Sequence, residues 1–188
     1  MSSNAEACFS QTYAQARERF LAAAATARLA VRSHLHPLPG ADGETLSMDV
    51  VRIGAPEARS LLMVSSACHG VEGFCGSGVQ VHLLSDGAVQ EAARSAGVAM
   101  LLVHGLNPWG FSHWRRVTHE NVDLNRNFHD FSRPLPTNAG YDELAKAILP
   151  ATWPPAAESE QRLQAYAARH GRACLLYTSD AADDLTRV

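Results

Sequence analysis

Two short apolar segments without internal charge restrict what this chain can fold into. They are residues 60–66, which read SLLMVSS, and residues 98–103, which read VAMLLV. Segments this short and apolar are typical of strands covered on both faces, as in the centre of a parallel sheet. A glycine-rich stretch and a segment with helical signals lie between them, so the order of elements is strand, helix, strand. This order predicts an α/β fold around a mixed, largely parallel sheet.

The flanking segments predict further elements of such a fold. Apolar residues recur at three- and four-residue steps over residues 11–33, which predicts an N-terminal helix. Residues 46–53 alternate loosely and are rich in β-branched side chains, which predicts a strand. Ser77 and Gln80 have the spacing of a capping box, so we expect a helix over residues 77–84. The same reasoning predicts helices over residues 142–149 and 157–170, the second of them ending at Gly171.

Composition and charge exclude several functional classes. The net charge of −3 gives no electrostatic reason to expect binding to nucleic acid or to an anionic membrane. No apolar run approaches the roughly 20 residues of a membrane-spanning helix, and the N-terminus lacks the features of a secretory signal. The cysteines have neither zinc-knuckle nor disulfide-scaffold spacing. We therefore expect a cytoplasmic protein with reduced thiols and with neither nucleic acid nor a membrane as partner.

A histidine and a glutamate follow the first apolar segment directly. His69 and Glu72 stand three residues apart among glycines, and residues 104–108 follow the second apolar segment. Ligands of open α/β sheets bind beyond the carboxyl ends of the strands, where glycines allow close approach. Imidazole and carboxylate are good zinc ligands. On spacing alone, however, a surface histidine and a glutamate at a helix start remain the preferred interpretation.

Residues 107–133 form a long irregular segment that is dense in Trp, Arg, His and Asn. A loop of this length is usually functional or disordered, and its aromatic residues argue against disorder. An arginine fork matches a carboxylate or a developing oxyanion, and asparagine adds a neutral donor. Each arginine alone can equally be a solvated loop charge, worth at most about 1 kcal/mol.

Taken together, these motifs resemble the zinc metallocarboxypeptidases, the carboxypeptidase A-like superfamily. The resemblance is closest to a bacterial branch described as a domain of unknown function, and it covers about residues 13–172. The segments that carry it are HPLPGADGE, SSACHGVEGFCGSGVQVHLL and NPWGFSHWRRVTHENVDLNRNF. The resemblance implies a three-layer α/β/α sandwich and a bound zinc ion as cofactor.

The resemblance also implies roles for single residues. His69 and Glu72 match the first two zinc ligands. Arg115, which follows Trp114, matches the arginine that stabilises the oxyanion, and Arg116 is its close competitor and a candidate for substrate binding.

Asn125 and Arg126 match the pair that holds the terminal carboxylate of the substrate. The implied activity is zinc-dependent hydrolysis of a peptide or amide bond next to a free carboxylate. The implied substrate is a small peptide or an acyl-amino acid.

Two functional residues of the superfamily have no counterpart in this chain. A third zinc-binding histidine and a general-base glutamate are missing, because His170 and the nearby glutamates fit an ordinary amphipathic helix. Residues 174–188 read CLLYTSDAADDLTRV and resemble a translated sequencing adapter. We therefore expect residues 1–173 to be the N-terminal part of one domain, incomplete at its C-terminus. Residues 174–188 are expected to be a non-native tail, with a native strand over residues 174–177 as the alternative, and the chain is expected to be an inactive fragment.

Three other functions remain open at this point. The first is a non-catalytic carboxylate-binding protein, or pseudoenzyme, that keeps only Asn125 and Arg126. The second is a nucleotide-binding module, although the glycines match neither G-x-G-x-x-G nor a P-loop. The third is a hydrolase with Cys75 as nucleophile, for which no partner base is identifiable.

Overall fold

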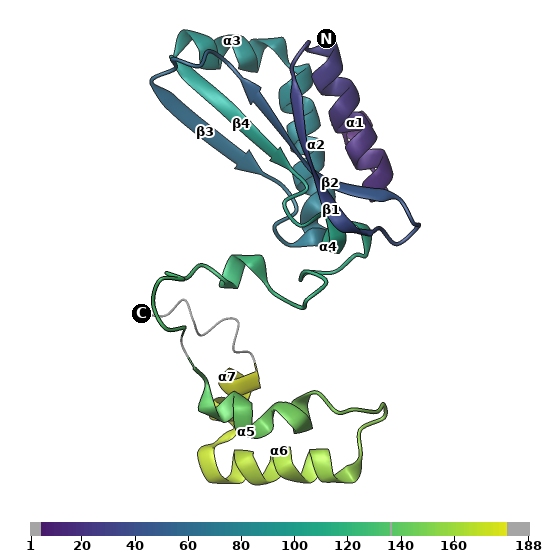
Figure 1. Ribbon diagram of the computed structural model, residues 1–188, viewed down its shortest axis with the longest axis vertical. Helices are drawn as coiled ribbons and strands as arrows, with labels where there is room; N and C mark the ends of the chain where they lie inside the picture. The colour runs from purple at the N-terminus through teal and green to yellow at the C-terminus, as the bar shows by residue number, and fades with distance from the viewer. Residues whose placement is uncertain (1–4, 136, 180–188) are drawn as a thin grey trace. The chain divides into compact units, whose positions relative to one another are not determined.

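The computed structural model describes residues 5–135 and 137–179 (Figure 1). The chain divides into two compact units, Met1–Asn125 and Arg126–Val188, which we describe separately. The first unit contains the sheet, and the described part of the second is helical. Each unit is built from elements adjacent in the sequence.

The sheet of the first unit has four strands in the order β1-β2-β4-β3. The bounds of the strands are Val31–Pro39 for β1, Thr45–Ile53 for β2, Ser60–Ser65 for β3 and Val98–His104 for β4. β3 pairs with β4 in parallel, whereas β1 with β2 and β2 with β4 pair antiparallel. An α/β fold with a mixed sheet is thus confirmed. Among the four described strands, however, the β3–β4 pair alone is parallel.

Two helices cover one face of this sheet. They are α1 (Tyr13–Thr26) and α2 (Gly73–Ser85), and both contribute to one apolar core with β2 and β4. α1 begins where the Thr12 hydroxyl accepts a hydrogen bond from the Gln15 amide, which is a typical N-cap. The buried residues of this core are Phe20, Ala24, Val51, Ile53, Val81, Leu84, Met100 and Leu102.

The shorter elements connect these helices and strands. They are η1 (Ala5–Cys8), η2 (Gly70–Glu72), α3 (Gly87–Ser95), α4 (Pro108–Ser112) and η3 (Leu124–Arg126). The η2 turn leads directly into α2, and α4 follows β4 after three residues. Both segments that follow β3 and β4 therefore start with a short helical turn.

The predicted helix over residues 11–33 is too long. α1 ends at Thr26, Arg28 has a left-handed backbone with φ of 56°, and β1 begins at Val31. The alanine-rich periodicity continues past Thr26, but residues 31–35 pair with β2 instead. Tertiary pairing therefore overrides local helical preference in this segment.

The predicted capping box at Ser77 and Gln80 is also wrong. α2 starts four residues earlier, at Gly73, so both side chains lie inside it. The Ser77 hydroxyl is hydrogen-bonded to His104 Nε2 at 2.9 Å. The Gln80 amide donates to the carbonyl oxygens of Val64 and Val103, at 2.8 and 3.1 Å. These polar residues therefore attach α2 to the sheet.

β3 is a strand, as predicted, but it is an edge strand among the described residues. Leu61, Leu62 and Met63 are 56%, 51% and 64% exposed. Successive side chains point to opposite faces of a strand, so both faces of β3 expose apolar side chains, although Val64 packs against the core. The expectation that this segment is covered on both faces is therefore wrong for these residues. An apolar run identifies a strand but not the number of its neighbours.

A buried ion pair connects α1 to β2. Asp49 is fully buried and accepts hydrogen bonds from Arg17 Nε at 2.7 Å and from the Ser33 and Ser47 hydroxyls. Burial alone raises the pKa of Asp49, but Arg17 and the two hydroxyls outweigh it and hold the pKa below its ordinary value. Asp49 therefore stays ionised inside the unit.

A second buried polar group lies at the end of β4. His104 is fully buried, and its ring stacks on Phe20 with the ring centroids 4.4 Å apart. Desolvation lowers its pKa to about 4; the Asp49 charge raises it by a smaller amount, and the Arg17 charge lowers it slightly further. Ser77 satisfies Nε2, whereas Nδ1 has no hydrogen-bond partner among the described residues. The geometry suits a neutral imidazole.

The second unit is built from three helices. They are α5 (Ala139–Ile148), α6 (Ala157–His170) and α7 (Arg172–Ser179), and Gly171, with φ of 88°, ends α6 as predicted. α7 crosses the boundary at which the non-native tail was predicted to begin, and its residues are helical rather than a strand. Residues 180–188 of that tail lie outside the described ranges. No helix within those ranges is long and apolar enough to cross a membrane.

His104 makes the stability of the fold depend on pH. Its pKa is about 4 in the folded chain, against 6.5 for an ordinary histidine. The unfolded chain therefore takes up a proton between these pH values that the folded chain does not. The free energy of unfolding is expected to fall by about 1.4 kcal/mol per pH unit as the pH drops through this window.

Urea unfolding, followed by circular dichroism at several pH values between 7 and 4, measures this slope. His104→Gln is the comparison, because glutamine is polar but does not titrate. An equal loss of stability in both proteins would rule out His104 as the cause.

Candidate functional site

The carboxyl ends of β3 and β4 meet at one rim of the sheet, as the sequence predicts. The Ser66 amide donates to the Val103 carbonyl at 3.0 Å, and the Leu106 amide donates to the Ser66 carbonyl at 2.9 Å. The Asn107 amide then donates to the Ala67 carbonyl at 2.9 Å. The two segments that follow β3 and β4 therefore run side by side, which brings the η2 turn next to α4.

A close contact between two glycines fixes the η2 turn against α4. A Cβ atom on Gly70 would lie 2.0 Å from the carbonyl carbon of Gly110, closer than any real contact. α4 itself is capped by Asn107, whose Oδ1 accepts from the Gly110 amide at 2.9 Å. Close backbone contacts thus account for Gly70 and Gly110, and no phosphate site is needed to explain these two glycines.

His69 lies between two carboxylates. Its Nδ1 is 3.3 Å from Glu72 Oε1, and its Nε2 is 3.0 Å from Asp123 Oδ1. Glu72 comes from the same turn and is exposed, whereas Asp123 comes from the loop after α4 and is only 8% exposed. The structure therefore brings together the two predicted metal ligands and adds a buried carboxylate behind the histidine.

Arg116 completes this group from the same loop. Its Nε donates to Asp123 Oδ2 at 2.9 Å, and the Asn125 amide donates to Asp123 Oδ1 at 2.9 Å. Burial raises the pKa of Asp123, but hydrogen bonds from Arg116 and His69 outweigh this and hold it below its ordinary value. Asp123 is therefore an anion near neutral pH, and it orients His69.

The hydrogen bond between His69 and Asp123 determines whether Nδ1 of His69 presents a hydrogen atom or a lone pair to Glu72. A carboxylate accepts, so Nε2 of His69 carries the hydrogen. In neutral imidazole, Nδ1 then has only a lone pair, and it faces the Glu72 carboxylate at 3.3 Å. Two lone pairs repel each other unless a cation lies between them. A proton on Nδ1, or a metal ion bound by both atoms, would relieve this repulsion.

The distance between His69 Nδ1 and Glu72 Oε1 suits two of the ligand positions around one zinc ion. Two ligands on a tetrahedral zinc ion, each about 2.0–2.1 Å from the metal, lie roughly 3.3 Å apart. The separation of His69 Nδ1 and Glu72 Oε1 is 3.3 Å. The described residues bring no group of three or more His, Cys, Asp or Glu side chains into metal-binding geometry. The fit therefore covers two ligands of a zinc site.

The side chains of the remaining predicted site residues are less closely connected to His69. The Arg115 side chain is exposed, and its backbone carbonyl accepts from the Val71 amide at 3.2 Å. Asn125 is exposed and contacts Asp123 through its amide, whereas Arg126 begins the second unit. Arg116 is thus the arginine that is tied to the His69 group in this structure. The roles of Arg115, Asn125 and Arg126 stay predictions.

Asp123 is the residue that sequence reasoning did not select. It opens the motif D-x-N-R-N, from which only Asn125 and Arg126 were assigned roles. Charge alone does not distinguish it from nearby Glu120, which is exposed. A second argument could have selected it. A histidine that binds a metal usually donates a hydrogen bond from its other ring nitrogen to a carboxylate or a carbonyl, so a carboxylate beside His69 was to be expected.

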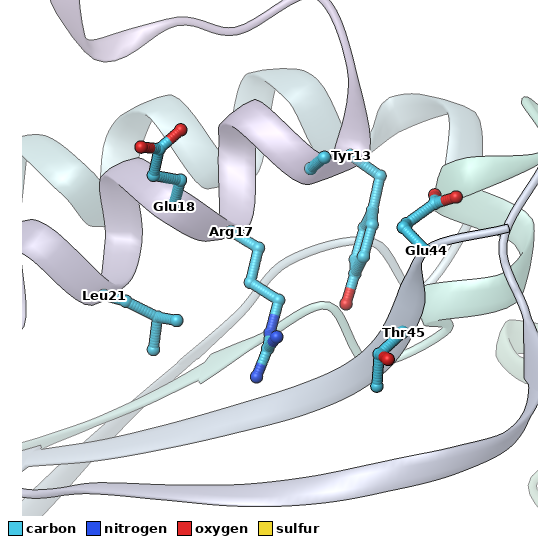
Figure 2. Close-up of a pocket in the computed structure, with 7 residues that line it drawn as sticks. Tyr13, Arg17, Glu18, Leu21, Glu44 and Thr45 are labelled. Carbon is cyan, nitrogen blue, oxygen red and sulfur yellow. The ribbon is translucent and has the colours of Figure 1, made fainter. Parts of the chain in front are cut away.

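A pocket of about 360 Å³ lies elsewhere, between α1 and the start of β2 (Figure 2). In Figure 2, the Tyr13 and Arg17 side chains reach from α1 toward the strand that carries Thr45. The pocket is lined by Tyr13, Ala14, Arg17, Glu18, Leu21, Glu44 and Thr45. None of the predicted site residues lines it. The orienting contacts among His69, Glu72, Asp123 and Arg116 make their group the better candidate.

The contact between Gly70 and Gly110 predicts that one added methyl group destabilises the fold strongly. Gly70→Ala is expected to lower the free energy of unfolding by more than about 2 kcal/mol, because the neighbouring atoms are backbone and cannot move aside easily. Gly87→Ala is the matched control, since nothing lies within 4 Å of a Cβ atom there. Urea unfolding measures both, and equal stability of the two variants would contradict the contact.

The two neighbouring arginines are expected to differ in their effect on stability. Arg116→Ala should lower the free energy of unfolding by about 1 kcal/mol, because it leaves the partly buried Asp123 with one partner fewer. Arg115→Ala is expected to have an effect within about 0.5 kcal/mol, since its side chain is exposed. Urea unfolding at low salt provides the comparison. A larger loss in Arg115→Ala than in Arg116→Ala would contradict this assignment.

Comparisons with solved structures give only distant similarity. The esterase LipW from Mycobacterium marinum is 20% identical, with a TM-score of 0.27, over 48% of this chain and 26% of that chain. A glutaminyl cyclase from Porphyromonas gingivalis is 17% identical, with a TM-score of 0.31, over 68% of this chain and 56% of that chain. This chain therefore spans about a quarter and just over half of these two proteins, respectively.

No curated protein matches the sequence. Residues 9–179 match the family described as "Protein of unknown function (DUF2817)". The match includes the sheet, the η2 turn, the loop with Asp123 and the helices of the second unit. The chain therefore belongs to the DUF2817 family.

Proposed function

We propose that this chain contributes part of the active site of a zinc-dependent hydrolase that cleaves a peptide or amide bond next to a free carboxylate. One observation carries the proposal. His69 Nδ1 and Glu72 Oε1 face each other at 3.3 Å while Asp123 occupies the other ring nitrogen. A metal cation held by both facing atoms would resolve their repulsion, as would a proton on Nδ1.

The residues of the chain have distinct tasks in this proposal. His69 and Glu72 hold the metal, and Asp123 fixes the tautomer and the ring orientation of His69. When bound, zinc polarises a carbonyl oxygen and lowers the pKa of a water molecule. Arg116, bonded to Asp123, keeps that carboxylate ionised and in place.

Arg115, from the same loop as Arg116, supplies the remaining charge. Arg115 is free to approach a developing oxyanion, where a preorganised cation contributes more than it does in water. Asn125 and Arg126 are the proposed ligands of the substrate carboxylate, through the planar fork of the arginine and the amide of the asparagine. Two ligands alone hold zinc weakly, so we expect the described residues to bind it with low affinity.

Zinc titration tests the metal site directly. Calorimetry is expected to show one zinc ion per chain, with binding weakened at least about tenfold in His69→Ala and in Glu72→Gln. Asp123→Asn is expected to weaken binding by about 10–100-fold, because it removes the carboxylate behind the ligand. His82→Ala is the matched control, since His82 also lies near a carboxylate, Asp86, at 3.7 Å. Equal affinity in all four variants would exclude the site.

Hydrolysis is tested separately with a full-length homologue that supplies the third zinc ligand and the general base. The substrates are small peptides and acyl-amino acids, with and without a chelator. Cleavage that is sensitive to the chelator and absent in His69→Ala supports the reaction. Cleavage that persists in His69→Ala contradicts it. Carboxylate binding without zinc or cleavage would instead support the non-catalytic alternative, in which Asn125 and Arg126 serve recognition alone.

A further inference from the structure

Asn107 lies at the junction of the segments that form the candidate site. It directly precedes α4 and is only 3% exposed. Its backbone amide donates to the Ala67 carbonyl at 2.9 Å, in the segment that leads to His69. Its backbone carbonyl accepts from the Phe111 amide of α4 at 3.0 Å. The backbone of Asn107 therefore connects the segment after β3 with the helix after β4.

The side-chain amide of Asn107 has a defined orientation. Its Oδ1 accepts from the Gly110 amide at 2.9 Å, so the oxygen is committed to the cap of α4. Nδ2 is buried and has no hydrogen-bond partner within residues 5–135 and 137–179. A buried donor without a partner is unfavourable, so its presence in a folded chain needs an explanation.

Two backbone carbonyls of the following loop lie close to this donor. A Cβ atom on Gly110 would lie 2.5 Å from Asn107 Nδ2, 2.7 Å from the Val117 carbonyl oxygen and 2.8 Å from the Arg115 carbonyl oxygen. One donor and two acceptors therefore surround the same side of the Gly110 Cα atom. Nδ2 donates and carbonyl oxygens accept, so a small shift of either carbonyl toward Nδ2 completes a hydrogen bond.

The segment with these carbonyls, residues 115–117, carries both arginines of the candidate site. Arg115 is the proposed partner of the oxyanion. Arg116 Nε donates to Asp123 at 2.9 Å, and Asp123 in turn contacts His69 Nε2 at 3.0 Å. The position of this segment therefore affects the charge at the site and the orientation of the histidine.

The Arg115 carbonyl also connects the segment to the η2 turn. It accepts from the Val71 amide at 3.2 Å, and the Arg115 amide donates to the Gly110 carbonyl at 2.8 Å. A backbone carbonyl has two lone pairs, so it can accept from Val71 and from Asn107 Nδ2 together. The side chain of Asn107 is thus placed to act on the contact between the loop and the turn.

We infer that Asn107 is a positioning residue of the candidate site, whose Nδ2 donor orders the segment with Arg115 and Arg116 against the turn with His69. The inference rests on the proposed function, because the arginines act in that reaction. It gives the two atoms of one carboxamide separate tasks. Oδ1 begins α4, and Nδ2 orders the loop after it.

Asn107→Ser separates these two tasks. Serine caps helices about as well as asparagine, but its single hydroxyl is then used by the cap. Amide hydrogen exchange, followed by NMR, is expected to be at least about tenfold faster at the Arg115 and Val71 amides, because their bonds depend on the ordered segment. The Gly110 amide is expected to keep its protection, since the cap remains.

Asn107→Asp tests the need for a donor at the same position. A carboxylate has the same shape and also caps helices, but it places an acceptor next to two carbonyl oxygens. Exchange at Arg115 and Val71 is expected to be faster than in Asn107→Ser at neutral pH. The excess over the wild type at the same pH is expected to shrink as the pH falls, because a protonated carboxyl donates again.

Asn138→Asp is the matched control. Asn138 caps α5 in the same way, since its Oδ1 accepts from the Tyr141 amide at 3.0 Å, but its side chain is exposed. This variant is expected to leave exchange at Arg115 and Val71 unchanged.

Two results would overturn the inference. The first is a loss of protection at the Gly110 amide of Asn107→Ser as large as that at Arg115 and Val71, which would assign Asn107 to the cap alone. The second is unchanged exchange at Arg115 and Val71 in Asn107→Ser. This variant decides the question even if the buried charge of Asn107→Asp prevents folding.

Hydrolysis by the full-length homologue distinguishes this inference from the proposed function. Substitution of the corresponding asparagine by serine is expected to lower kcat with little change in KM, because the arginine that it positions acts in the transition state. Faster exchange in Asn107→Ser without hydrolysis by the homologue supports the positioning role and counts against the reaction. Hydrolysis that requires the histidine but is unchanged by the asparagine substitution supports the reaction and overturns the positioning role.

Discussion

The parallel pairing of β3 with β4 is the constraint on which the candidate site depends. Because the two strands run in the same direction, the segments that follow them leave the sheet at one rim, side by side. The contact between Gly70 and Gly110 then fixes the distance between these segments. A histidine from the first and an aspartate from the loop beyond the second meet as a result.

The site combines rigid and accessible parts. Asp123 and the ring of His69 are largely buried and bonded to each other, whereas Glu72, Arg115 and Trp114 are exposed. The buried parts determine the direction in which Nδ1 of His69 points. The exposed parts remain available to a metal ion and a ligand. This division is the usual arrangement for a site built on a rigid scaffold with functional loops.

The sequence predicted element types well because they depend on local pattern. The strands near residues 46–53, 60–66 and 98–103 and the helix over residues 157–170 are all present. Boundaries and neighbours were predicted less well, because they depend on pairing that local pattern does not encode. Val31 joins a strand although the helical period continues through it, and Ser77 bonds to His104 instead of capping a helix.

Prediction of the candidate site has the same limit, because local sequence pattern does not encode contacts between distant residues. The approach of His69 to Glu72 follows from a spacing of three residues, which the sequence displays directly. The approach of Asp123 to His69 spans 54 positions and depends on the path of the whole loop after α4. Arg115 and Arg116 are neighbours with identical side chains, and the fold alone distinguishes the one that reaches Asp123.

Strand β3, at the edge of the sheet among the described residues, has a consequence for the chain in a cell. Its outer edge combines three exposed apolar side chains with no charge and no proline, the features by which most edge strands avoid unwanted pairing. Molecular chaperones bind segments of this composition when they are accessible. An edge of this kind is also a template for pairing with another chain, so its covering bears on aggregation independently of the chemistry at His69.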